Sequence, residues 1–320
     1  MRNFSVIPEA DFASEMDRRV DPFLESVRTD GIFRGCDGKA LCWHSFAAGS
    51  PVANVVILHG YTESGEKYRE MSWYFLSQGY SVWLYDQRGH GKSCRDVPDK
   101  TLTHVDSFDD YVGDLECFLE QIVPRDLPLF LYSHSMGGAV AALFLENHPH
   151  TFDRAVLSSP MVAPSTGSYP AFAGRAICRA AKLFGGAKKR IFMASDYPGH
   201  EIFADSCGNS EPRFSRYELF RRTHEDYQNF SPTYSWTLES LLVCRRILKK
   251  GRPERIETKV LILSGGRDTV VLIPPQQELA KRIPHCRYRM FPTAKHEIFI
   301  STDDIMIPYV EEILSFFGRE

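Results

Sequence analysis

The stretch that decides the fold is Ser133-His134-Ser135-Met136-Gly137-Gly138. It lies between an apolar run at 129–132 and a helix-forming run at 139–145, so the sequence predicts a strand, a sharp turn and a helix. Such a turn exposes a serine hydroxyl above a sheet, beside backbone N–H groups and a helix N-terminus, and it needs small neighbours. Ser135 is therefore a candidate nucleophile. The alternative is a chance turn of small residues that carries a surface serine.

Short apolar runs on both sides of this turn alternate with helix-like stretches. Strands are predicted at 52–58, 81–85, 129–132, 155–158, 260–263 and 287–291, and helices at 68–78, 106–123 and 305–317. Continuous apolar strands separated by helices are typical of a parallel sheet buried on both faces. From about 160 to 251 the pattern stops, and Gly, Ser, Pro and aromatic residues predict short helices and loops. We therefore predict an α/β core (1–160 and 251–320), with a doubly wound, mostly parallel sheet, and an inserted, mainly helical cap (161–250).

The composition excludes several classes of protein. With 320 residues, of which 43% are hydrophobic, the chain can bury a large core, and its net charge of −3 argues against nucleic acid as a partner. Eight cysteines are scattered without a Cys-x-x-Cys pair or a His/Cys cluster, so we expect no metal, no disulfide framework and a reducing compartment. We expect no cofactor. The first 30 residues are rich in acids and do not resemble a secretory signal, and no apolar run reaches 18 residues, so we expect a cytoplasmic protein that does not span a membrane.

Two polar residues follow predicted strands at the edge where Ser135 lies. Asp268 comes after the strand at 260–263 and His296 after the strand at 287–291. In an open parallel sheet, ligands bind outside the carboxyl ends of the strands, and the order Ser, Asp, His is the one expected for this type of sheet. We expect His296 to accept the serine proton and Asp268 to orient the imidazole. A surface histidine and a capping aspartate are the alternatives.

Two backbone N–H groups are candidates for stabilising a tetrahedral intermediate. One belongs to Met136, directly after the candidate nucleophile, and the other to Tyr61, in the loop after the strand at 52–58. We interpret His59, in the same loop, as a structural hydrogen-bonding residue. The glycine-containing turn at 86–93 lacks the spacing of a phosphate-binding loop, so we interpret it as a support for the site.

Taken together, these motifs resemble a known family. His59-Gly60-Tyr61-Thr62-Glu63-Ser64, the turn at 85–93, the serine motif, Gly266-Arg267-Asp268 and Ala294-Lys295-His296-Glu297 look like those of α/β-hydrolases of the monoacylglycerol lipase and bacterial lysophospholipase group, within the serine aminopeptidase-like hydrolases. The stretches 108–115, 157–161 and 231–236 look closer to the bacterial inner-membrane lysophospholipases. Ser133 departs from the family, which usually has glycine there.

The resemblance implies the α/β-hydrolase fold and a serine esterase that removes the single acyl chain from a lysophospholipid or monoacylglycerol. The same three residues also serve acyl transfer, perhydrolysis, carbon–carbon hydrolysis or cleavage of small esters, because fold and residues do not fix the substrate. A non-catalytic binding protein with this fold is the third alternative. The sequence does not fix acyl-chain length, head group or oligomeric state.

The predicted cap carries an unusual distribution of charge. Between residues 161 and 195 there is no acidic residue, but there are six cations, at Arg175, Arg179, Lys182, Lys188, Lys189 and Arg190. Aromatic and aliphatic residues are spaced among the cations at 171–184, as in a basic amphipathic helix that lies on an anionic membrane. Peripheral contact with the cytoplasmic face of the inner membrane is one interpretation, and a solvated face of the cap is the other.

Overall fold

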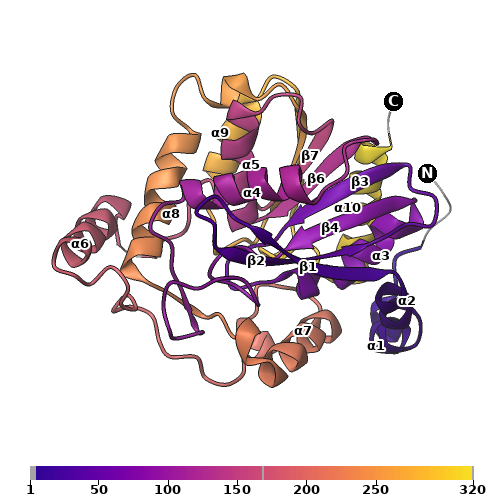
Figure 1. Cartoon of the computed structure of the whole chain (residues 1–320), viewed down its shortest axis with the longest axis horizontal. Coiled ribbons are helices and arrows are strands. Elements are labelled where there is room, and N and C mark those ends of the chain that lie inside the picture. The colour runs from indigo at the N-terminus through magenta and orange to yellow at the C-terminus, as the bar shows by residue number, and fades with distance from the viewer. Residues whose placement is uncertain (1–4, 168, 319–320) are drawn as a thin grey trace.

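A computed structural model describes residues 5–167 and 169–318, and an eight-stranded sheet lies at its centre (Figure 1). The strands run in the order β1-β2-β4-β3-β6-β7-β9-β10. Their bounds are β1 Arg28–Arg34, β2 Ala40–Phe46, β3 Ala53–Leu58, β4 Tyr80–Tyr85, β6 Leu129–His134, β7 Arg154–Ser158, β9 Lys259–Gly265 and β10 Cys286–Phe291. Neighbours from β4 to β10 pair in parallel, and β2 is antiparallel to β1 and to β4. The predicted parallel sheet is confirmed.

Strand β1 was not among the predicted strands. Only Phe33 in it is buried, and the other residues are exposed or half-buried. An edge strand of this kind carries no continuous apolar run, because its two faces are not both buried as those of the central strands are. The sequence signal used for the central strands is therefore missing at this edge of the sheet.

Helices cover both faces of the sheet because strand residues alternate between two cores. Val56 and Leu58 of β3 face α4 (Asp109–Gln121), α5 (Met136–Asn147) and α9 (Ile273–Arg282). Val55 and Ile57 face α3 (Arg69–Ser77) and α10 (Asp303–Phe317). These two layers fix the direction in which each strand delivers its terminal residues.

The segment between β7 and β9 contains three helices that are longer than the predicted short ones. They are α6 (Ala171–Leu183), α7 (Glu211–Thr223) and α8 (Tyr234–Ile247). Helix α7 has no apolar stripe, because its buried side chains are Arg213, Glu218 and Arg221. A short parallel pair joins this segment to the core, with β5 (Leu102–Thr103) beside β8 (Ser231–Pro232).

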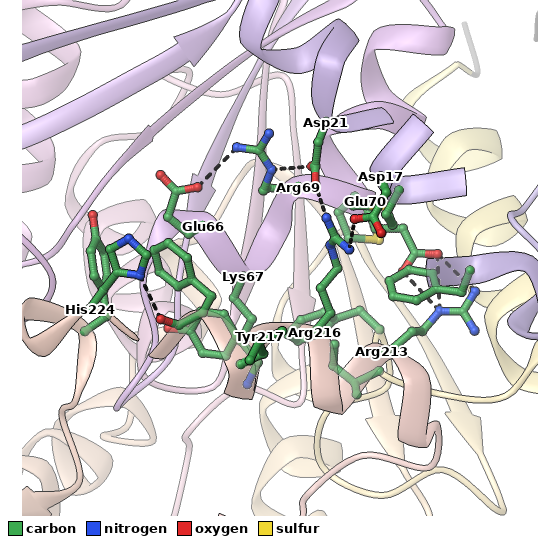
Figure 2. Close-up of a pocket in the computed structure, with 18 of the residues that line it drawn as sticks. Asp17, Asp21, Glu66, Lys67, Arg69, Glu70, Arg213, Arg216, Tyr217 and His224 are labelled. Carbon is green, nitrogen blue, oxygen red and sulfur yellow. Dashed lines mark hydrogen bonds and ion pairs between the residues drawn. The ribbon is translucent and has the colours of Figure 1, made fainter. Parts of the chain in front are cut away.

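Helix α7 is fixed to the N-terminal segment, which forms α1 (Phe12–Glu15) and α2 (Asp21–Ser26). The guanidinium of Arg213 is fully buried, donates to the Ile7 carbonyl at 2.7 Å, and pairs with Glu70 of α3 at 3.0 Å. Arg216, one turn later, reaches Asp17 and Asp21 closer to solvent. Figure 2 shows both arginines extending from α7 toward these acids.

Among the described residues, no helix is long and apolar enough to cross a membrane.

We predict that Arg213→Met lowers the free energy of unfolding by about 3–5 kcal/mol, because it leaves Glu70 buried without its cation. Arg216→Met is the matched control, and its half-exposed ion pairs contribute only about 0–1 kcal/mol. Urea unfolding, followed by circular dichroism, measures both values. Equal losses for the two variants would contradict this account of how α7 is held.

Candidate active site

The turn between β6 and α5 holds Ser135 in a backbone conformation that is rare for a residue with a side chain. Its φ is 50° and its ψ is −114°, which places it in the left-handed half of conformational space. The Ser135 N–H donates to the Ser158 carbonyl at 3.1 Å, and the Met161 N–H donates to the Ser135 carbonyl at 2.9 Å. These bonds, one to the last residue of β7 and one from the loop after it, hold the strained turn in place.

Small residues are needed around this turn because α5 approaches β3 closely. A Cβ added at Gly137 would lie 2.3 Å from the Leu58 carbonyl oxygen. Ser133, which stands where the family usually has glycine, is fully buried, and its hydroxyl donates to the Val156 carbonyl at 3.1 Å. The extra hydroxyl is therefore satisfied inside the sheet.

The structure brings the three predicted residues into one hydrogen-bonded chain. His296 Nε2 lies 2.9 Å from Ser135 Oγ, and His296 Nδ1 lies 2.7 Å from Asp268 Oδ2. A carboxylate can only accept, so Nδ1 carries the imidazole proton and Nε2 is free to accept from the serine hydroxyl. The second oxygen of Asp268 accepts from the backbone N–H groups of Val270 at 2.8 Å and Val271 at 3.0 Å. This second pair of bonds fixes the carboxylate that orients His296.

The loop after β3 carries Tyr61 and is held by His59. The Gln87 N–H donates to His59 Nε2 at 2.8 Å, so Nδ1 carries the proton and donates to the Gly60 carbonyl at 2.8 Å. Burial lowers the pKa of His59 to about 4, which keeps the ring neutral. The Gln87 side chain also donates to the His59 carbonyl at 2.6 Å. His59 and the turn at 86–93 thus have the supporting positions expected from the sequence.

The two predicted N–H donors belong to Met136, at the start of α5, and to Tyr61, in the loop after β3. Met136 is the first residue of α5, so its N–H has no acceptor one turn earlier in the helix. Tyr61 packs against Trp236 of α8, with ring centroids 4.2 Å apart. The oxyanion role of both groups remains a prediction.

A buried charge network below His296 was not found from the sequence. Glu63 accepts from the Gly60 N–H at 2.6 Å and from the Tyr68 hydroxyl at 2.5 Å. Lys67 lies 2.9 Å from Glu63 and 2.6 Å from Glu297. Burial opposes the charged form of Glu63, but the attraction of Lys67 holds the pKa of Glu63 below its usual range. The sequence signals were a Glu–Lys pair four residues apart and an acid directly after His296.

This network reaches the site through His134, which precedes the nucleophile. The rings of His134 and His296 have centroids 4.7 Å apart, and Glu63 lies 3.7 Å from His134. Burial lowers the pKa of His134 to about 3, so a neutral ring packs beside His296.

Two cavities lie near this network. One, of about 430 Å³, is lined by Thr62 and Glu297, the sequence neighbours of Tyr61 and His296. The other, of about 590 Å³, lies between the N-terminal helices, α3 and α7, and none of the three residues of the hydrogen-bonded chain lines it (Figure 2). None of these three residues lines the smaller cavity either, and Lys67 of the buried network lines both cavities.

Comparisons with known proteins identify the family of this chain. The family model described as serine aminopeptidase, S33 matches residues 49–303. A probable lysophospholipase L2 of Haemophilus influenzae is 28% identical over 291 residues, which cover 89% of this chain and 90% of that protein. A monoacylglycerol lipase of Mycolicibacterium smegmatis is 23% identical, and the matched residues cover 86% of this chain and 92% of that lipase.

Solved structures give the same fold. The crystal structure of a monoacylglycerol lipase of Paleococcus ferrophilus superimposes with a TM-score of 0.67 at 21% identity, covering 86% of this chain and 99% of the other. The family match spans residues 49–303, and the structural match covers 86% of the chain. This protein is therefore a hydrolase of the α/β-hydrolase fold and belongs to the serine aminopeptidase S33 family.

Proposed function

We propose that this protein hydrolyses the ester of a glycerolipid with a single acyl chain, a monoacylglycerol or a lysophospholipid, through an acyl-enzyme on Ser135. The observation that carries the proposal is the hydrogen-bonded chain from Ser135 through His296 to Asp268. A serine hydroxyl is a weak nucleophile at neutral pH, and an adjacent oriented base activates it. The names of the two relatives supply the substrate class.

The proposed reaction proceeds in two steps that use the same groups. His296 takes the proton of Ser135 as its Oγ attacks the ester carbonyl, and the N–H groups of Tyr61 and Met136 stabilise the oxyanion. His296 then donates that proton to the leaving alkoxide, and the acyl chain remains on Ser135. In the second step His296 deprotonates a water that attacks the acyl-enzyme, and it returns that proton to Ser135 Oγ as the fatty acid leaves.

We further propose that residues 161–250 form a cap that contacts an anionic membrane surface through α6. Phe172, Leu183 and Phe184 are 68%, 81% and 84% exposed, respectively. Lys188 and Lys189 lie next to them and form no ion pair with any described residue. Figure 1 shows α6 at the outer edge of the molecule, beside α8. Exposed apolar side chains flanked by free cations are the features of a surface-bound amphipathic helix.

We predict that Ser135→Ala lowers kcat for an octanoyl p-nitrophenyl ester by at least about 10⁴-fold, since no other group replaces the nucleophile. His296→Ala should lower it to a similar extent, because the residues act as a unit. Ser26→Ala, on the exposed side of α2, is the control and should retain wild-type turnover. A Ser135→Ala enzyme that kept a tenth or more of its turnover would overturn the proposed mechanism.

We predict that replacing Lys188 and Lys189 together by Gln weakens binding to phosphatidylglycerol vesicles by roughly 30-fold, since each lysine at an anionic surface contributes about 1 kcal/mol. Cosedimentation at low salt measures the partition coefficient. The exposed lysines Lys259 and Lys281 provide a matched double Gln control, which should bind as wild type does. Equal weakening in both double variants would show that α6 is not the contact surface.

A further inference from the structure

We propose that Asn209, in the segment between β7 and β9, is a positioning residue that holds the loop of His296 in place for proton transfer. The inference rests on the proposed ester hydrolysis, in which His296 is the base. It adds a residue that the sequence motifs did not indicate. The inserted segment then helps to set the geometry of the base.

His296 lies in the loop between β10 and α10, and the end of β9 supports this loop. The Arg267 N–H donates to the Ala294 carbonyl at 2.9 Å, and a Cβ added at Gly265 would lie 2.2 Å from the Lys295 carbonyl oxygen. Because the loop is not part of a helix or a sheet, its remaining N–H and carbonyl groups need partners from elsewhere in the chain.

The side chain of Asn209 supplies two of these partners. Its Oδ1 accepts from the Lys295 N–H at 2.9 Å, and its Nδ2 donates to the Thr293 carbonyl at 3.2 Å. One amide therefore satisfies a donor and an acceptor of the same loop. Since Lys295 directly precedes His296, the first of these bonds fixes the backbone one residue before the base.

The backbone around Asn209 holds the loop on the other side of the base in the sequence. The Glu297 N–H donates to the Cys207 carbonyl at 2.9 Å, and the Asn209 N–H donates to the Ile300 carbonyl at 2.7 Å. A Cβ added at Gly208 would lie 2.5 Å from Ile300 Cγ2 and 2.7 Å from the Ile300 carbonyl oxygen. The two chain segments therefore approach so closely that a side chain at Gly208 does not fit.

Both sequence neighbours of His296 are thus bonded to residues 207–209, and the chemistry of the base depends on its position. His296 Nε2 lies 2.9 Å from Ser135 Oγ, and His296 Nδ1 lies 2.7 Å from Asp268 Oδ2. A displacement of about 1 Å at such a site can lower the rate by about 100-fold. Asn209 acts on this geometry through the backbone of the loop.

The test separates a positioning role from a contribution to stability alone. We expect Asn209→Ala to lower kcat for the octanoyl p-nitrophenyl ester by about tenfold and to leave KM within about twofold, since His296 acts in the transition state. Asn209→Asp keeps an acceptor for the Lys295 N–H, so it should recover part of the lost kcat. Gly208→Ala should also lower kcat, because its methyl group pushes the segment away from Ile300.

Asn54→Ala is the matched control. The buried Asn54 side chain also accepts one N–H and donates to one carbonyl, those of the Trp83 indole at 2.9 Å and of Pro124 at 3.3 Å. Asn54 lies near the start of β3, at the opposite end of this strand from the loop that carries Tyr61. This variant should lower the midpoint of urea unfolding and retain the wild-type kcat per folded molecule.

The outcomes separate the two proposals. The positioning role would be overturned by wild-type kcat in Asn209→Ala, by a raised KM at unchanged kcat, by an equal loss of kcat in Asn54→Ala, or by Asn209→Asp being as slow as Asn209→Ala. Should Asn209→Ala fail to fold, wild-type kcat in folded Gly208→Ala would overturn it in the same way. All of these results leave the proposed hydrolysis standing, whereas absence of turnover by the folded wild type would overturn both.

Discussion

The close contact between α5 and β3 is the constraint on which the site depends. Gly137 lies so near the Leu58 carbonyl that no side chain fits, and the residue at the start of this close approach, Ser135, has a left-handed conformation. The same turn lifts Ser135 Oγ to His296 and leaves the Met136 N–H pointing beyond the end of the helix. The contact between Ser135 and His296 and the unpaired position of the Met136 N–H at the start of α5 therefore belong to the same turn.

Buried charge has a second organising role in this molecule. Arg213 joins α7 to the N-terminal segment and α3, and Lys67 joins the loop after β3 to the residue that follows His296. Such networks are costly to desolvate, so they require complete pairing. The same ion pairs thus connect elements that are far apart in the sequence.

The sequence predicted the features that local patterns encode. Apolar runs located the central strands, and the order of Ser135, Asp268 and His296 after three of them located the hydrogen-bonded chain. Helix α7 was not predicted at its full length because charged residues form its buried face, and β1 was not predicted because most of its side chains are exposed or half-buried. The Lys67–Glu297 pair joins residues 230 positions apart, and a local sequence pattern does not predict a contact over that separation.

The central claim is that Ser135 is the nucleophile activated by His296, and covalent labelling tests it most directly. A long-chain fluorophosphonate forms a stable adduct only with an activated serine, and mass spectrometry of the digested protein identifies the modified residue. The account predicts a single adduct on Ser135 in the wild type and its loss in His296→Ala. An unmodified Ser135 in the folded wild-type protein, or an adduct on a different serine, would contradict it.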